Sequence, residues 1–285
     1  MYNSEMKLRE YVASAINEAK QTFTEDPYRL RFHITPPVGL LNDPNGLVYF
    51  KGKYHVFYQW NPFEMEHGRK YWGHMTSEDL VNWEEQEYAL APAEWYEKDG
   101  CYSGSAIVHD SKLYILYTGN VKDSSGNRET FQCLAVSEDG IHFEKKGPVI
   151  RLPSVYTPHF RDPKVWKEDG LFYTIVGAQT KTLKGAAALF MSTDLYDWKH
   201  IGPLKTDFDD FGYMWECPDL FKLDGKDVFL FSPQGLEKEP FKYQNIYQSG
   251  YSLGEIELES AVFRHGDFHE LDYGLDFYAP QTFQD

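Results

Sequence analysis

The hydrophobic pattern of the chain changes character near residue 30. Before that point, apolar residues recur at helical spacing with charged residues between them, namely Leu8, Val12, Ala15 and Ile16. Ser4 can cap such a helix, and Asp26-Pro27 is a signal that ends it. We therefore expect residues 1–29 to form a helical segment that packs on the outside of the main domain.

From residue 30 onward, short β-like runs alternate with Gly, Asp, Asn and Pro, and the runs repeat. A Ser-x-Asp-x-x-x-aromatic frame occurs three times, beginning at Ser77, Ser137 and Ser192. Each frame is typical of a turn with a packed ring, so we assign it to structure. The repeat length is about 55 to 60 residues, with repeats opening near residues 43, 103, 162 and 216.

A period of this length, filled with strands, suits a propeller blade of four antiparallel strands. The sequence therefore predicts an all-β fold, an incomplete five-bladed β-propeller over residues 30–285. Four blades are expected, followed by the start of a fifth at Phe277-Tyr278-Ala279-Pro280-Gln281.

Three stretches place an acid just ahead of a proline at the opening of a repeat. They are Asn42-Asp43-Pro44-Asn45-Gly46, Arg161-Asp162-Pro163 and Glu216-Cys217-Pro218. The inner strands of a propeller surround one channel, so equivalent positions on them meet. Crowded carboxyl groups favour a proton on one of them, and we hypothesise that Glu216 is that member. A protonated acid beside an ionised one is the catalytic pair that glycoside hydrolases use.

Composition narrows the possible partners. The 285 residues carry a formal net charge of -16, which disfavours nucleic acid and anionic membrane surfaces as partners. A local basic pocket for one phosphate would not be visible in a net charge. Arg69-Lys70 and Lys181 to Lys184 are candidates for such a contact, although each also fits a solvated loop.

Cysteine and histidine usage gives no sign of a metal or a disulfide framework. Cys101, Cys133 and Cys217 form no CxxC pair, and the spacing of His67 and His74 matches no helical metal motif. Cys217 adjoins Glu216, where it could tune the acid or simply pack. No signal peptide or membrane span is indicated. We expect a cytoplasmic protein with reduced thiols, no metal and no cofactor.

The ordered motifs resemble those of the β-fructofuranosidases, the glycoside hydrolase family that includes invertase, levanase and sucrose-6-phosphate hydrolase. Besides the three acid stretches, the matching motifs are Gln59-Trp60-Asn61-Pro62, Trp72-Gly73-His74 and Tyr102-Ser103-Gly104-Ser105. They cover the chain from about residue 30 to residue 285. Within the family, Leu40-Leu41 ahead of the Asn-Asp pair resembles bacterial sucrose-6-phosphate hydrolases, since other members often carry a tryptophan there.

The resemblance implies roles for individual residues. Asp43 would be the nucleophile, Glu216 the general acid and base, and Asp162 the stabiliser of a retaining reaction through a covalent fructosyl-enzyme. The substrate would be a small sugar, sucrose 6-phosphate or else sucrose or short fructans, and the oligomeric state stays open. The sugar pocket would be lined by Leu41, Asn42, Gln59, Trp60, Trp72, Tyr102, Ser103 and Arg161.

The family pattern continues further than this chain. Its members have a complete fifth blade and then a C-terminal β-sandwich, so we expect either a fragment or a form whose gap is filled by a partner copy. One alternative function is a non-catalytic or assembly-dependent sugar-binding fragment. Another is an inverting arabinan-cleaving propeller, against which the Asn-Asp-Pro-Asn-Gly and Glu-Cys-Pro motifs speak.

Overall fold

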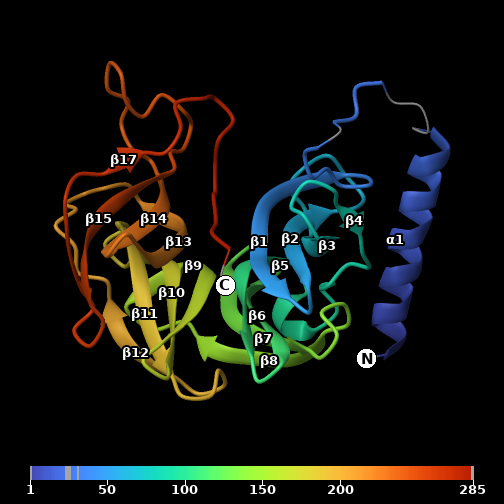
Figure 1. Cartoon of the computed structure of the whole chain (residues 1–285), viewed down its shortest axis with the longest axis horizontal. Coiled ribbons are helices and arrows are strands. Elements are labelled where there is room, and N and C mark those ends of the chain that lie inside the picture. Colours follow the sequence, from blue (N-terminus) through green and yellow to red (C-terminus); the bar gives the residue numbers. More distant parts are fainter. Residues whose placement is uncertain (1, 23–26, 31, 284–285) are drawn as a thin grey trace.

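The computed structural model describes residues 2–22, 27–30 and 32–283 (Figure 1). One long helix, α1 (Tyr2–Thr22), lies beside a body built of strands, in which a short 3-10 turn spans Trp95–Glu97. The strands are β1 (Leu40–Phe50), β2 (Lys53–Asn61), β3 (Tyr71–Ser77), β4 (Glu84–Glu85), β5 (Cys101–His109), β6 (Lys112–Lys122), β7 (Arg128–Ser137), β8 (Glu144–Arg151), β9 (Tyr156–Glu168), β10 (Leu171–Thr180), β11 (Gly185–Ser192), β12 (Trp198–Pro203), β13 (Met214–Leu223), β14 (Lys226–Gln234), β15 (Gly250–Glu257), β16 (Val262–His265) and β17 (His269–Glu270).

The strands form four antiparallel sheets in chain order, as expected for propeller blades. Blade 1 is β1-β2-β3-β4, blade 2 is β5-β6-β7-β8, blade 3 is β9-β10-β11-β12, and blade 4 is β13-β14-β15-β16 with β17 also paired to β15. The first strand of each blade is its innermost, and β1 contacts β5, β5 contacts β9, and β9 contacts β13. The predicted four-blade arrangement is confirmed.

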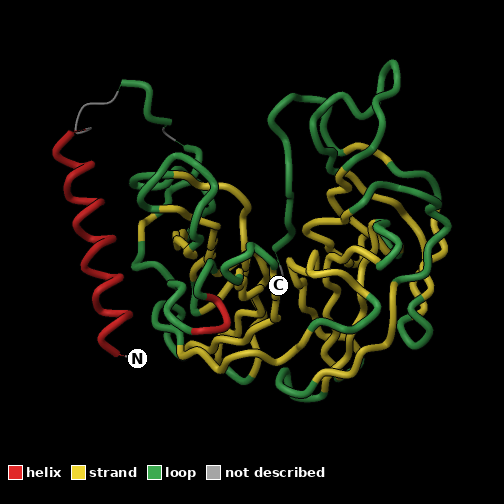
Figure 2. The backbone as a smooth tube through the Cα atoms, turned by 180° about the vertical axis from the view of Figure 1, so that it is seen from behind, coloured by secondary structure: helices red, strands yellow, loops and turns green. Residues whose placement is uncertain are grey.

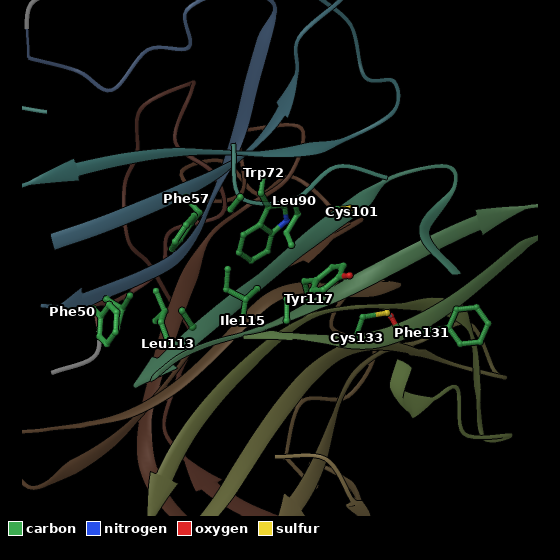
Figure 3. Close-up of a cluster of buried hydrophobic side chains, with 14 of the residues drawn as sticks. Phe50, Phe57, Trp72, Leu90, Cys101, Leu113, Ile115, Tyr117, Phe131 and Cys133 are labelled. Carbon is green, nitrogen blue, oxygen red and sulfur yellow. The ribbon is translucent and has the colours of Figure 1, made fainter. Parts of the chain in front are cut away.

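Aromatic packing between blades holds the body together. Figure 3 shows the cluster between blades 1 and 2, where Phe57 and Trp72 meet Ile115 and Tyr117, all fully buried. Every residue of β3 is buried, because a strand inside a blade is covered by neighbouring blades on both faces. Removing one such ring typically costs about 3–5 kcal/mol of stability, so the repeated aromatics of the sequence serve mainly the core.

Helix α1 packs against blade 1, as the helical spacing predicts. Val12 is buried in a cluster with Tyr58 and Trp60, and Leu8 and Ile16 pack on the edge of that cluster. The side chain of Ser4 and residue Asp26, which the sequence assigned to the helix ends, lie outside the described residues. In the part of the chain that the structure describes, no helix is long and apolar enough to cross a membrane.

The Ser-x-Asp frames are blade turns, as predicted. Each begins on a serine that closes the third strand of a blade. In the third frame, Ser192 Oγ donates to Asp194 Oδ1 at 3.0 Å, and that oxygen also accepts from the backbone nitrogens of Tyr196 and Asp197 at 2.9 Å. The Asp79 and Asp139 frames repeat the pattern. Because these hydrogen bonds are local, the frame recurs wherever a blade needs the turn.

The residues after β17 return to the middle of the molecule without forming a strand. Figures 1 and 2 both show this run descending between blades 1 and 4 to the C-terminus. Ala279 N donates to Ser249 Oγ at 3.1 Å, and Thr282 N donates to Asp219 Oδ2 at 3.0 Å. The ring of Phe283 meets Tyr54 of β2 edge-on at 5.8 Å. The predicted opening of a fifth repeat thus contacts both flanking blades.

Candidate active site

Each innermost strand carries a bulge at the position where the sequence predicts a site residue. The pairing register slips at Asn42 and Asp43 in β1, at Ser103 in β5, at Asp162 and Pro163 in β9, and at Cys217 and Pro218 in β13. A bulge places one extra residue against the partner strand and re-aims its side chain. Proline suits this place because it has no N–H to give to the ladder.

Two of these bulges use a left-handed backbone. Asp162 has φ 65° and Cys217 has φ 47°, a conformation that side chains other than Gly, Asn and Asp adopt at a cost. In the β5 bulge the backbone of Gly104 packs closely against β6, and a Cβ atom there would lie 2.1 Å from the carbonyl oxygen of Leu116. A left-handed or glycine-dependent backbone at all three positions indicates that side-chain direction there is closely determined.

Asp43 is held by neighbouring polar side chains. Ser103 Oγ donates to its Oδ2 at 2.6 Å, and Asn42 Nδ2 donates to its Oδ1 at 3.2 Å. Gln59 Nε2 donates to Ser103 Oγ at 2.5 Å, and Lys70 Nζ donates to Asn42 Oδ1 at 2.7 Å. Burial, together with the negative charge of a neighbouring glutamate, raises the pKa of the Asp43 carboxyl above its usual value, although these hydrogen bonds oppose the rise.

Asp162 is the most enclosed of the three acids, at 4% exposure. Its Oδ2 accepts from the backbone nitrogen of Cys217 at 3.1 Å, and its own N–H donates to Thr118 Oγ1 at 3.0 Å. Burial raises the pKa of this carboxyl to about 7, with Arg161 opposing the rise and the charges of Glu216 and Asp43 adding to it. The expected crowding of carboxyl groups is therefore present.

Glu216 is surrounded by donors. Arg161 donates to Oε1 from Nε at 2.9 Å and from Nη2 at 2.6 Å. Gln234 Nε2 donates to Oε2 at 2.6 Å, and the hydroxyl of Tyr278 donates to the same oxygen at 2.5 Å. Burial and then the charge of Glu216 raise the pKa of Tyr278 far above its usual value, so its hydroxyl keeps the proton that it donates.

The three acids share one pocket of about 920 Å³, at the upper end of the usual range for small-molecule sites. The predicted residues on its lining are Leu41, Asn42, Asp43, Gln59, Tyr102, Arg161, Asp162 and Glu216. Acids from the innermost strands of three different blades thus face one cavity, as expected from the repeats.

Three of the residues expected to line the pocket lie behind its wall, which corrects that expectation. Trp60 packs toward α1 and donates from Nε1 to the carbonyl of Val38 at 2.6 Å. Trp72 is fully buried between blades 1 and 2 and donates from Nε1 to the carbonyl of Tyr102 at 3.0 Å. Ser103 is fully buried, and its Oγ hydrogen-bonds to Asp43 and Gln59. The packing of α1 on Trp60 and of blade 2 on Trp72, and the hydrogen bonds of Ser103, keep these side chains out of the cavity, so they support the wall.

Sequence reasoning missed several pocket residues. Gln234 and Tyr278 bind Glu216, and Tyr247 also lines the cavity. Lys70, which the sequence offered as a candidate for a phosphate contact, lines the pocket and donates to Asn42. A signal was available for Tyr278, because it lies in the predicted opening of a fifth repeat, the place where the other repeats deliver their site residues. No comparable signal marks Gln234 at the end of β14.

The cysteines and histidines near the site have ordinary structural surroundings. The three cysteines are buried and unpaired, and burial raises the pKa of the Cys217 thiol well above its usual value. His74 is buried with its Nε2 3.0 Å from Nδ1 of His55, whereas His67 is exposed at the pocket. Among the described residues, no group of His, Cys, Asp and Glu side chains is arranged to hold a metal ion.

Comparison with known families gives one match that covers nearly all of the strand body. The model of the glycosyl hydrolases family 32 N-terminal domain matches residues 33–285. This range includes all four blades and every residue of the pocket described above.

Individual relatives agree with the family match. A sucrose-6-phosphate hydrolase of Bacillus subtilis is 56% identical over 288 residues, which cover 100% of this chain and 60% of that protein. A solved sucrose-6-phosphate hydrolase of Lactobacillus gasseri has a TM-score of 0.90 at 39% identity, covering 95% and 57% of the two chains. A β-fructofuranosidase of Bombyx mori in complex with sucrose has a TM-score of 0.90 at 42% identity, covering 98% and 60%. The chain thus spans about 60% of the length of the relatives it matches.

Proposed function

The chain belongs to glycosyl hydrolase family 32, and on that premise we propose that it is the catalytic part of a retaining β-fructofuranosidase that cleaves sucrose 6-phosphate. The observation that carries the proposal is the meeting of Asp43, Asp162 and Glu216 in one pocket. The names of the similar hydrolases and β-fructofuranosidases support the reaction class.

In the first step, the Asp43 carboxylate attacks the anomeric carbon of the fructosyl unit. The bond from that carbon to the glycosidic oxygen breaks, and Glu216 gives the departing oxygen a proton. The hydrogen bonds from Ser103 and Asn42 fix the direction of the attacking carboxylate. A covalent fructosyl-enzyme and the free second sugar result.

In the second step, water attacks the same carbon and releases the Asp43 carboxylate. Glu216 takes a proton from that water, and two displacements in succession return the original configuration. The hydrogen bonds of Gln234 and Tyr278 to Oε2 hold Glu216 in place through both steps. That Glu216 carries a proton in the free enzyme stays a prediction.

Asp162 and Arg161 act without forming a bond to the substrate carbon. Asp162 lines the pocket at 4% exposure, and a carboxylate there stabilises the positive charge that develops on the sugar ring. Arg161 is nine-tenths buried and donates twice to Glu216, so it fixes that acid relative to Asp162. Leu41, Asn42, Gln59 and Tyr102 contact the sugar from the lining in this proposal.

The proposal includes a cytoplasmic location and a small sugar phosphate as partner. A charged sugar phosphate does not cross a bilayer unaided, so its hydrolase is expected on the side where the phosphate ester is formed. The unpaired thiols of the three buried cysteines suit a reducing compartment.

The test is release of glucose 6-phosphate from sucrose 6-phosphate by the folded 285-residue chain, with sucrose run beside it. We expect release that disappears in the Asp43→Ala variant, with an unchanged circular dichroism spectrum. If a chain shown to be folded released nothing from either sugar, the proposal would fail and a sugar-binding role would replace it.

A further inference from the structure

A second group of charged side chains lines the same pocket. Besides Arg161, the lining includes five basic residues, namely His67, Arg69, Lys70, Lys122 and Arg128. In a chain with a formal net charge of -16, this is a local reversal of charge. Lys70 is already engaged, since its Nζ donates to Asn42. The remaining basic residues have no part in the reaction described above.

Lys122 and Arg128 face each other across one hairpin of blade 2. Lys122 ends β6, Arg128 begins β7, and the two are directly paired across the ladder. Directly opposite residues share a face of the sheet, and like charges in that arrangement destabilise it. In the described part of the chain, neither side chain has a carboxylate within ion-pair distance. The guanidinium of Arg128 lies 5.6 Å from the centroid of the Tyr102 ring.

Among the described residues, the carboxylates near this hairpin form no ion pair with Lys122 or Arg128, and two of them accept hydrogen bonds from other groups. Asp99 lines the pocket, but its Oδ2 accepts from Lys98 Nζ and from the backbone nitrogen of Lys122, each at 2.6 Å. Asp123 accepts from Asn127 and from backbone nitrogens within its own turn. Asp276 lines the pocket from the C-terminal run. The ammonium of Lys122 and the guanidinium of Arg128 therefore remain available to an anion.

The residues around the acids are more deeply buried in the pocket than the second group of basic residues. Asp162 and Arg161 are 4% and 8% exposed, whereas Arg69 and Lys122 are exposed and Arg128 is half-buried. A substrate whose anomeric carbon reaches the buried acids has room in the same pocket for its departing sugar to extend toward the exposed cations. Tyr102 connects the two regions, because its ring is close to the guanidinium of Arg128 and it precedes Ser103, the donor to Asp43.

We propose that Lys122 and Arg128, with Arg69 beside them, form a subsite for the phosphate group on the departing sugar. An arginine offers two parallel donors to phosphate oxygens, and a lysine adds a mobile positive charge. The inference rests on the proposed function, because it assigns this part of the same pocket to the second sugar. It makes these residues the determinants of preference for a sugar phosphate over the plain sugar.

The test measures binding without turnover. The Asp43→Ala variant and the same variant carrying Lys122→Gln, Arg128→Gln or both are each titrated by calorimetry with sucrose 6-phosphate and with sucrose. Each lost cation should weaken sucrose 6-phosphate binding about tenfold, and both together about a hundredfold. Sucrose binding should change less than about threefold. Added salt should weaken binding of the phosphate ester and leave sucrose binding nearly unchanged.

Two further variants control this experiment. Arg128→Lys keeps the charge and should recover part of the lost affinity for the phosphate ester, which a purely structural role of Arg128 would not predict. Lys199→Gln removes an exposed lysine on the outermost strand of blade 3, outside this pocket, and should change neither affinity.

The outcomes separate this inference from the proposed function. Equal losses for both sugars, or no loss in the double variant, would overturn the phosphate subsite even if the wild-type chain hydrolyses both. A chain that binds sucrose 6-phosphate through these cations but releases no product would support the subsite and contradict the catalytic proposal.

Discussion

Tyr278 and Glu216 are 62 residues apart in the chain, yet the hydroxyl of Tyr278 lies 2.5 Å from Oε2 of Glu216. The contact joins the last described segment to the innermost strand of blade 4. It makes the C-terminal run part of the candidate active site, because a donor on this run determines how one of the three acids is held.

Replacing Tyr278 by Phe should lower kcat by about tenfold, since one hydrogen bond that holds Glu216 in place is lost. KM should change little, because Tyr278 acts through Glu216. The matched control is Tyr247→Phe, which removes a hydroxyl whose bond is to Tyr213. Similar kinetics for the two variants would mean that the contact with Glu216 has no special role.

Removing either reacting carboxyl should nearly abolish turnover. We expect Asp43→Ala and Glu216→Gln each to lower kcat by about a thousandfold or more, the usual scale for such groups. The basic limb of the pH–rate profile should be lost in Glu216→Gln. Glu129→Gln, at an exposed position of β7, serves as the charge-matched control. Appreciable activity in Asp43→Ala would remove Asp43 from its assigned role.

Asp162→Asn should stabilise the fold at neutral and higher pH. The folded-state pKa of about 7 lies above the unfolded value of 3.8, so between these values the folded state binds a proton that the unfolded state lacks. Wild-type stability contributed by this group is present below pH 3.8 and is lost as pH rises to about 7. Asparagine also tolerates the left-handed backbone of this position.

The check is urea unfolding of both chains across the pH range. The stability gain of Asp162→Asn should be roughly 1–2 kcal/mol at pH 8 and should shrink toward pH 4. Activity should fall in the same variant, as expected where function costs stability. A gain that did not depend on pH would argue against a raised pKa at Asp162.

The buried pair of Lys164 and Asp219 should be essential to stability. Their side chains lie 2.8 Å apart at 5% and 1% exposure, and Thr282 bonds to both. Lys164→Met leaves a buried carboxylate without its cation and should cost about 3–5 kcal/mol in urea unfolding. The control is Lys112→Met, which breaks an exposed pair with Glu138 and should leave the midpoint unchanged. Equal midpoints for the two variants would contradict the argument.

Local sequence patterns predict much of the architecture. The helical spacing of Leu8, Val12 and Ile16 predicts α1 and its buried face, and the Ser-x-Asp frames predict the blade turns, because both depend on residues a few positions apart. The repeat length predicts the four blades. It also brings Asp43, Asp162 and Glu216 to one cavity, because equivalent positions of repeats meet at a shared axis.

Other features depend on contacts that no local pattern encodes. The family motifs predicted Trp60 and Trp72 on the pocket wall. In the structure, Trp60 of β2 is buried against α1 and Trp72 of β3 is buried against blade 2. Gln234 reaches Glu216 across 18 residues through strand register, and Lys122 faces Arg128 across a hairpin ladder.

Periodicity and repeat spacing in the amino-acid sequence are sufficient to predict the blades, their turns and the convergence of three acids. The folded arrangement is needed to show which side chains reach the acids, which remain behind the wall and which basic residues gather at the pocket. The physical reason is that these choices depend on bulges, strand register and packing between blades, which exist only after the strands have paired.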